Sequence, residues 1–205
     1  MHIGEGILTP PVAAATWVAG AACIGVGLRR LDPDVIPRVA VLSSAFFVAS
    51  LIQVPLGPAS AHLVLNGLMG VLLGWTVFPA LAVALVLQAV FFGFGGFTSL
   101  GANVLIMGSG ALAARAVFRA GRRDRVAAGA LVRGGMAGAV GILVGAATLA
   151  ALLAAGGREF AGAVAVIAAA HLPVAAAEAM VTAAVLSFLA RVRPELLPGC
   201  AGGQG

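Results

Sequence analysis

The sequence has little charge and no lysine. Only 9% of its 205 residues are charged, against about 25% in an average soluble domain. Hydrophobic residues make up 61% of the chain, and the mean hydropathy is +1.11. All twelve basic residues are arginines, and they lie in short stretches between apolar runs rather than along one continuous stripe. This composition excludes a soluble domain and a nucleic-acid-binding protein, and it predicts an all-α integral membrane protein.

Motifs for catalysis and for structural metal sites are also missing. The two cysteines, Cys23 and Cys200, belong to no CxxC pair, so neither a zinc site nor a disulfide framework is expected. Cys23 lies in an apolar segment and is interpreted as a small packing residue. The sequence contains no HExxH, no GxSxG, no GxxxxGK[ST] and no paired carboxylates in one segment. We therefore predict no enzyme, and any uphill transport must draw on ATP hydrolysed by another protein.

Seven apolar segments predict seven transmembrane helices in one membrane domain, residues 1–190, followed by a short cytoplasmic tail, residues 191–205. The third segment is short for a full span and is expected inside the bundle. No signal peptide is expected, because the first residues carry no positive charge and arginines follow the first apolar run. In the second segment, Ala45 and Ala49 form a small-residue packing pattern. The segments are 11–28, 36–53, 62–74, 79–94, 99–118, 130–155 and 160–190.

The arginines predict the orientation of these helices. With the N-terminus outside, eleven of the twelve arginines fall at inner connections and only Arg158 falls outside, in agreement with the positive-inside rule. We expect a multi-pass protein of the cell membrane, the inner membrane where a cell has two. In this orientation Met1, His2 and the loop that leads to His62 share the outer side.

The first two residues suit a planar metal site. The α-amine of Met1 and the backbone nitrogen of His2 close a five-membered chelate ring, and that nitrogen and the His2 Nδ1 close a six-membered one. Three nitrogens then lie in one plane, and an imidazole from elsewhere can complete the square. Planar nitrogen ligands favour Ni(II) or Cu(II), whereas Zn(II) prefers a tetrahedron. His62 is the candidate fourth ligand, and the alternative is that it caps or extends from a helix end.

Three further polar residues lie near the same outer side. Asn66 is expected one helical turn beyond His62, where it either orients the imidazole or hydrogen-bonds a neighbouring helix. Ser60 and Asn103 are weaker candidates for the same supporting role.

His171 and Glu178 lie seven residues apart, two turns along one face of the last segment. We interpret them as hydrogen-bonding partners between helices or at a subunit contact, with metal ligation as the alternative. The helical rise places Glu178 towards the inner half of the membrane, away from the outer site. Gln88 is interpreted in the same way.

Three stretches of the sequence resemble the CbiM/NikM family, the substrate-binding subunits of energy-coupling factor (ECF) transporters for cobalt and nickel. They are MHIGEGILTPP, IQVPLGPASAHLVLNGLMGVLLGW and FFGFGGFTSLGANVLIMG. The resemblance extends from residue 1 to about residue 190, and the version VPLGPASAHLVLNGLMG is more similar to the nickel branch. It implies a six-helix substrate-binding bundle with an added N-terminal helix and a square-planar metal held by Met1, His2 and His62.

The resemblance also implies partners: a transmembrane coupling subunit, two cytoplasmic ATPases and, in some systems, a separate small accessory membrane subunit. Ala45 and Ala49 are candidates for docking the coupling subunit. The expected function is high-affinity binding of Ni(II) in an ATP-driven uptake transporter, with Co(II) as the alternative ion. The rival hypothesis is a metal-independent structural or channel-like membrane protein that begins with Met-His by chance.

Overall fold

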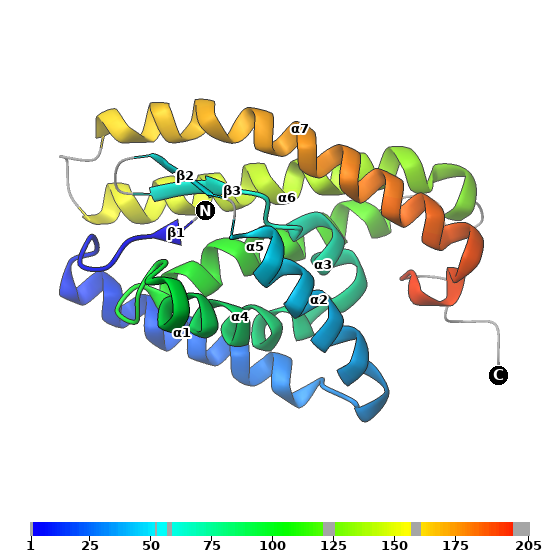
Figure 1. Cartoon of the computed structure of the whole chain (residues 1–205), viewed down its shortest axis with the longest axis horizontal. Coiled ribbons are helices and arrows are strands. Elements are labelled where there is room, and N and C mark those ends of the chain that lie inside the picture. The colour runs from blue at the N-terminus through cyan, green and yellow to red at the C-terminus, as the bar shows by residue number, and fades with distance from the viewer. Residues whose placement is uncertain (1, 52, 57–58, 121–125, 157–160, 199–205) are drawn as a thin grey trace.

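The computed structural model describes residues 2–51, 53–56, 59–120, 126–156 and 161–198, which form a helical bundle enclosing a small sheet (Figure 1). Within these residues there are seven α-helices, three strands and three short 3₁₀ turns. The strands are β1 (His2–Ile3), β2 (Gln53–Leu56) and β3 (Ala59–His62). The α-helices are α1 (Pro10–Arg29), α2 (Ile36–Ala49), α3 (Asn66–Leu73), α4 (Val77–Phe92), α5 (Leu100–Ala120), α6 (Val126–Gly156) and α7 (Ala161–Val192), and the 3₁₀ turns are η1 (Pro33–Val35), η2 (Gly74–Thr76) and η5 (Pro194–Leu196).

The helices α6 and α7 lie along one another, and α5 packs against α6 (Figure 1). The short helix α3 contacts α5, α6 and α7, and all eight of its residues are buried. Its glycines explain this close packing: a Cβ at Gly67 would lie 2.5 Å from the Cα of Gly138, and a Cβ at Gly70 would overlap the carbonyl oxygen of Ala111. Small residues thus bring helix backbones into direct contact, as is typical of membrane bundles.

Five helical stretches among the described residues are long and apolar enough to cross a membrane. Helices α3 and α4, joined by η2, count as one such stretch, Asn66–Phe92, and the 14-residue α2 is not among them. Large apolar side chains such as Val83, Met180 and Phe188 are exposed on the outside of the bundle, where lipid would cover them. The chain is therefore a predominantly helical, multi-pass membrane protein, and the number of seven membrane crossings stays a prediction.

The predicted helix boundaries are close to those observed, except around residues 50–65. The sequence predicts a second helix to residue 53 and a third from residue 62, whereas α2 ends at Ala49 and α3 begins at Asn66. Between them β2 and β3 form an antiparallel pair with Gln53 opposite His62, and β1 adds to β3 to give the order β1-β3-β2. The all-α prediction missed the pairing of β1 with β3 because these strands lie more than 50 residues apart in sequence, where local periodicity gives no signal. It missed the local pair of β2 and β3 because each of these strands has only four residues.

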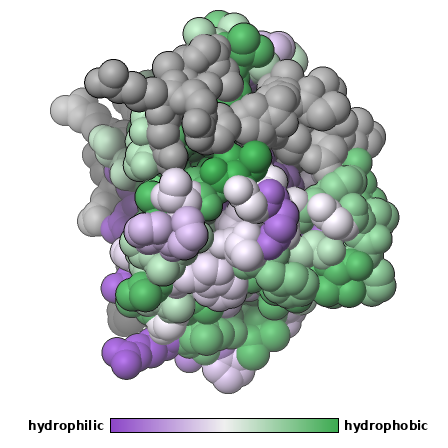
Figure 2. All heavy atoms as spheres, turned by 90° about the vertical axis from the view of Figure 1, so that its left-hand side faces the viewer, coloured by the Kyte–Doolittle hydropathy of each residue, from purple (hydrophilic) through white to green (hydrophobic). Residues whose placement is uncertain are grey.

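The end of the molecule nearest the sheet differs from its helical sides. Figure 2 looks at this end and shows purple and pale residues near the middle of the face, with green, hydrophobic residues around them. A polar end surrounded by apolar helix sides is what the interface between a bilayer and water requires.

Candidate metal centre

His2 lies in a buried strand rather than in a loose terminus. The strand β1 pairs with β3 so that His2 is opposite Ser60 and Ile3 is opposite Ala59. The His2 residue is 3% exposed and Ile3 is fully buried. Because β3 contacts α7 and β1 contacts α5, the helices hold the start of the chain inside the bundle. The sheet pairing also satisfies backbone groups that would be costly to bury unpaired.

Asn103 fixes the backbone directly after His2. The Ile3 N–H donates to Asn103 Oδ1 at 2.8 Å, and Asn103 Nδ2 donates to the Ile3 carbonyl at 3.1 Å. The same Nδ2 lies 3.4 Å from Ser99 Oγ. The asparagine side chain thus pairs with Ile3 as a neighbouring strand would, and it continues the hydrogen bonding of β1 on the side away from β3. Asn103, predicted only as a weak supporting candidate, is a direct backbone partner of the N-terminal strand.

A glycine-rich loop between α4 and α5 covers the same segment. Gly95 (φ +77°) lies beside His2 and Asn103, since a Cβ there would be 3.5 Å from His2 Cδ2 and 2.9 Å from Asn103 Nδ2. At Gly96 (φ +114°) a Cβ would overlap the carboxylate of Glu5. That carboxylate accepts a hydrogen bond from the Thr98 N–H at 3.1 Å. Only glycine combines these backbone angles with this lack of space.

The other two proposed ligands fall partly or wholly outside the described structure. Met1 lies outside the described residues. His62 is the last residue of β3, two positions along the strand from Ser60, and its side chain, like that of Ser60, lies outside the described part. Two residues of a strand span about 7 Å and return to the same face of the sheet. The register therefore brings positions 2 and 62, far apart in sequence, onto neighbouring strands.

Glu178 of α7 holds the backbone that follows His62. Its Oε1 accepts the N–H of Val64 at 2.6 Å and also the N–H of Leu65. Leu65 has φ 56°, a left-handed conformation that costs a non-glycine residue about 1–3 kcal/mol. Two backbone donors offset the burial of the carboxylate and hold this turn in place.

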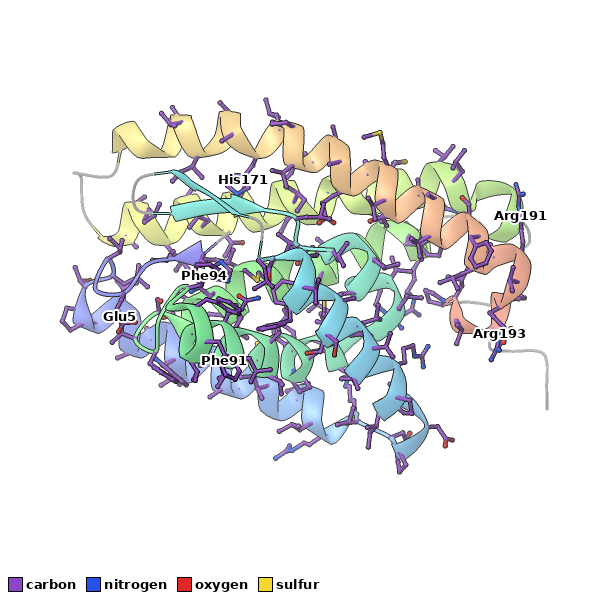
Figure 3. All side chains as sticks on the ribbon, viewed as in Figure 1. Glu5, Phe91, Phe94, His171, Arg191 and Arg193 are labelled. Atoms are coloured by element: carbon purple, nitrogen blue, oxygen red, sulfur yellow. The ribbon has the colours of Figure 1, made fainter. Side chains whose placement is uncertain are left out.

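The prediction that Glu178 lies away from the outer site is therefore wrong. That prediction counted helical rise from an assumed site at the membrane surface, whereas the sheet lies inside the bundle, alongside α7 (Figure 1). His171, on the same helix, is fully buried, and its Nδ1 lies 2.6 Å from the carbonyl of Ile167 in its own helix. Figure 3 shows His171 on the stretch of α7 that lies beside the sheet.

Asn66 does not stand one helical turn beyond His62, because His62 belongs to β3 and Asn66 is the first residue of α3. The Asn66 side chain is fully buried, and neither its Oδ1 nor its Nδ2 has a hydrogen-bond partner among the described residues. A Cβ at Gly110 of α5 would lie 2.9 Å from Asn66 Nδ2. Asn66 therefore lies between helices, and no described group forms a hydrogen bond with its side-chain amide.

Burial keeps the His2 imidazole neutral. It lowers the pKa of His2 from 6.5 to about 3, while a hydrogen bond with Gln88 acts in the opposite direction. Gln88, on α4, also donates to Ser50 Oγ. A neutral imidazole is the form that binds a metal. Within the described residues no three His, Cys, Asp or Glu side chains are grouped to hold an ion.

Ala45 and Ala49 of α2 lie on the side of the helix that packs against the bundle. Ala45 and Ala49 are partly buried and pack against the hydrophobic core, whereas Val41 and Val48 of the same helix are exposed. Docking of a partner by this helix stays a prediction.

Glu5 and Gln88 are the contacts that sequence reasoning missed or undervalued. Glu5 is the only acidic residue before Asp32, and a carboxylate inside an otherwise apolar opening is a signal that could have identified it. Gln88 lies in a strongly apolar helix, where a buried amide needs a partner.

The fold defines an integral membrane protein whose first strand is buried in a small sheet within the helical bundle. Residues 2–196 match the family described as "CbiM: Cobalt uptake substrate-specific transmembrane region". The chain belongs to this family, and it is the substrate-specific membrane component of a cobalt or nickel uptake system.

Relatives agree with this assignment. A Haemophilus influenzae protein whose name refers to metal transport is 40% identical over 200 residues, which cover 96% of this chain and 97% of that protein. The fused nickel transport protein NikMN of Rhodobacter capsulatus is 38% identical, and the match covers 96% of this chain but 64% of that longer protein. The crystal structure of a transition metal transporter has a TM-score of 0.81 and 26% identity, covering 94% of this chain and 93% of that one.

Proposed function

We propose that this chain is the substrate-binding subunit of an ATP-driven ECF transporter and captures Ni(II) in a square-planar site of four nitrogens. The ligands are the α-amine of Met1, the backbone nitrogen and Nδ1 of His2, and the imidazole of His62. The observation that carries the proposal is the pairing of His2 with Ser60, since it seats the beginning of the chain on the strand that ends at His62.

The surroundings support preorganisation of such a site. Asn103 holds the backbone after His2, and Glu178 holds the backbone after His62. A site whose ligands are fixed before binding loses less entropy when the ion arrives. The neutral, buried His2 imidazole needs no deprotonation before it binds.

Nickel is preferred over cobalt because planar nitrogen coordination with a deprotonated amide suits Ni(II). Co(II) stays the alternative ion.

The proposed partners are a transmembrane coupling subunit, a pair of cytoplasmic ATPases and, in some systems, a small accessory membrane subunit. The chain crosses the membrane seven times with its N-terminus outside, as a six-helix bundle with one added N-terminal helix, and residues 1–190 form its single membrane domain. Arg191 and Arg193 are exposed beyond that domain (Figure 3), on the side that the positive-inside rule assigns to the cytoplasm.

The test compares the purified protein with a free N-terminus against a variant carrying one extra residue before Met1. Titration calorimetry with Ni(II) is expected to show tight binding, together with a yellow square-planar absorption band, only for the free form. His2→Ala is expected to remove both signals. Equal binding by the extended chain would exclude the chelate, and absence of Ni(II) and Co(II) binding by the free form would favour the metal-independent alternative.

A further inference from the structure

A basic pocket lies away from the metal centre, where the connection between α1 and α2 meets η2 and α5. It has a volume of about 600 Å³, and residues of η5 complete its wall. Four arginines line it: Arg30, Arg38, Arg115 and Arg119. Among the described residues none of the four has a carboxylate within ion-pair distance, and the one acidic lining residue, Glu195, is bonded to Arg193 at 2.5 Å.

Two of these arginines are held in position. Arg115 Nη1 donates to the carbonyl of Val71 at 2.8 Å, and its guanidinium occupies the space that a Cβ at Gly74 would need. The Arg30 guanidinium lies 5.3 Å from the centre of the Trp75 ring. Arg38 and Arg119 are close enough to Arg115 for their charges to act on it. Like charges gathered in one partly closed pocket need an anion to offset their repulsion.

An apolar groove is lined by stretches of chain next to those that line this pocket. It has a volume of about 440 Å³ and lies between α2 and α4. Apart from Ser43 and Ser44 every lining residue is apolar, and the Ser43 hydroxyl already donates to the Ala80 carbonyl at 2.8 Å. The same stretches of chain line both hollows, since Leu28 and Leu31 of the groove flank Arg30, and Val39 follows Arg38.

We propose that the pocket and the groove together bind one anionic phospholipid, with its phosphate among the arginines and an acyl chain along α2 and α4. Guanidinium groups pair with phosphate oxygens in bidentate fashion, and basic pockets between membrane helices bind lipid headgroups. A lipid fits better than a soluble anion because residues adjacent in sequence line both the basic pocket and a groove of apolar side chains, which suits an acyl chain. A zwitterionic lipid fits less well, because its ammonium group would lie among four arginines.

This proposal does not depend on the metal centre. In the orientation proposed above, the pocket faces the cytoplasmic leaflet, whereas the ion enters from the other side. A failure of lipid binding would therefore leave the proposed nickel site untouched, and the reverse also holds.

The test is native mass spectrometry of the purified chain in detergent, titrated with phosphatidylglycerol and, separately, with phosphatidylethanolamine. One phosphatidylglycerol is expected to bind, about tenfold more tightly than phosphatidylethanolamine. The double variant Arg30→Gln/Arg38→Gln is expected to lose this preference, whereas the control Arg29→Gln/Arg191→Gln, which removes the same charge from outside the pocket, is expected to keep it. Equal binding of the two lipids, or equal loss in both double variants, would overturn the proposal.

The acyl chain is tested separately by Ser44→Trp, which fills the groove from an exposed position of α2. Weaker phosphatidylglycerol binding, with an unchanged melting temperature, is expected. Unchanged binding in this variant, or complete displacement of the lipid by millimolar inorganic phosphate, would show that the pocket takes a free anion and would overturn the lipid assignment.

Discussion

The sheet and the arginine pocket use opposite means of recognition. At the sheet, the described polar groups are buried and held by hydrogen bonds to backbone, as with Asn103 on Ile3 and Glu178 on Val64. At the pocket, the polar groups are charged, partly or fully exposed, and turned towards open space. A small ion needs ligands fixed to within fractions of an ångström, whereas a flexible lipid is attracted by charge and adapts its own shape. Recognition therefore depends on rigidly held ligands at the sheet and on charge at the arginine pocket.

The largest expected effect is a difference in Ni(II) affinity between variants of His62 and His171. His62→Ala is expected to weaken Ni(II) binding by about a thousandfold, because one of four ligands of the plane is lost, which is worth roughly 4 kcal/mol. His171→Gln, which changes a buried histidine outside the proposed ligand set, is expected to change the affinity by less than about threefold. Calorimetry of both variants measures this. A larger loss of Ni(II) affinity for His171→Gln would indicate that the metal centre lies nearer to α7 than proposed.

Acidification is expected to have the next largest effect and to act only at the sheet. The α-amine has an ordinary pKa near 8, and the amide nitrogen must lose its proton to bind, so protons compete with the metal as the pH falls. Between pH 7.5 and 5.5 the Ni(II) affinity is expected to fall by at least about a hundredfold. His2 contributes little to this loss, because its pKa is lowered to about 3 and its imidazole is neutral over the whole range.

Phosphatidylglycerol binding is expected to stay constant between pH 7.5 and 5.5, since arginine keeps its charge. A parallel titration of metal and lipid would therefore distinguish the two regions within one sample. Equal sensitivity of both ligands to pH would contradict the comparison.

Asn103→Ala tests whether the hydrogen bonds that hold the backbone of β1 also position the metal site. It removes two hydrogen bonds to Ile3, each worth about 0.5–1.5 kcal/mol, and is expected to weaken Ni(II) binding roughly tenfold to a hundredfold. The matched control is Ser109→Ala on the same helix, which removes a hydroxyl 3.0 Å from Thr148 Oγ1 and far from β1. An Asn103→Ala variant that binds like the unmodified chain would show that Asn103 stabilises the fold without positioning His2.

The smallest effect concerns Glu178→Gln. The amide oxygen can accept the same two backbone N–H groups but carries no charge, so the turn at Leu65 loosens and Ni(II) affinity is expected to fall by about three- to tenfold. Glu195→Gln, an exposed carboxylate bonded to Arg193, is expected to leave the metal affinity unchanged. Calorimetry and melting temperature should be measured together, so that a loss of fold is distinguished from a loss of positioning.

Much of the helical fold was predictable because a long run of apolar residues is by itself enough to indicate a membrane helix. The first segment, predicted as 11–28, is Pro10–Arg29, and the fifth, predicted as 99–118, is Leu100–Ala120. The prolines at the start of α1 behave as expected for a first turn.

The pairing of β1 with β3 and the supports of the sheet were not predictable, because each depends on a partner far along the chain. Asn103 was identified as a polar residue near the outer side, but its partner Ile3 lies 100 residues earlier. Glu178 was placed away from the outer site by counting the rise along the last helix, which says nothing about how deep β3 lies. Leu65 adopts a left-handed conformation that no propensity of leucine would suggest.

The short helix α3 has a consequence for how the protein is made. It is eight residues long and packs on α5, α6 and α7, all of which are synthesised after it. The hydrogen bond from Val64 to Glu178 spans 114 residues. A nascent chain therefore carries β3 and α3 through most of translation without the later helices that finally pack against them, and the turn after His62 gains its carboxylate partner only when the last helix has entered the membrane.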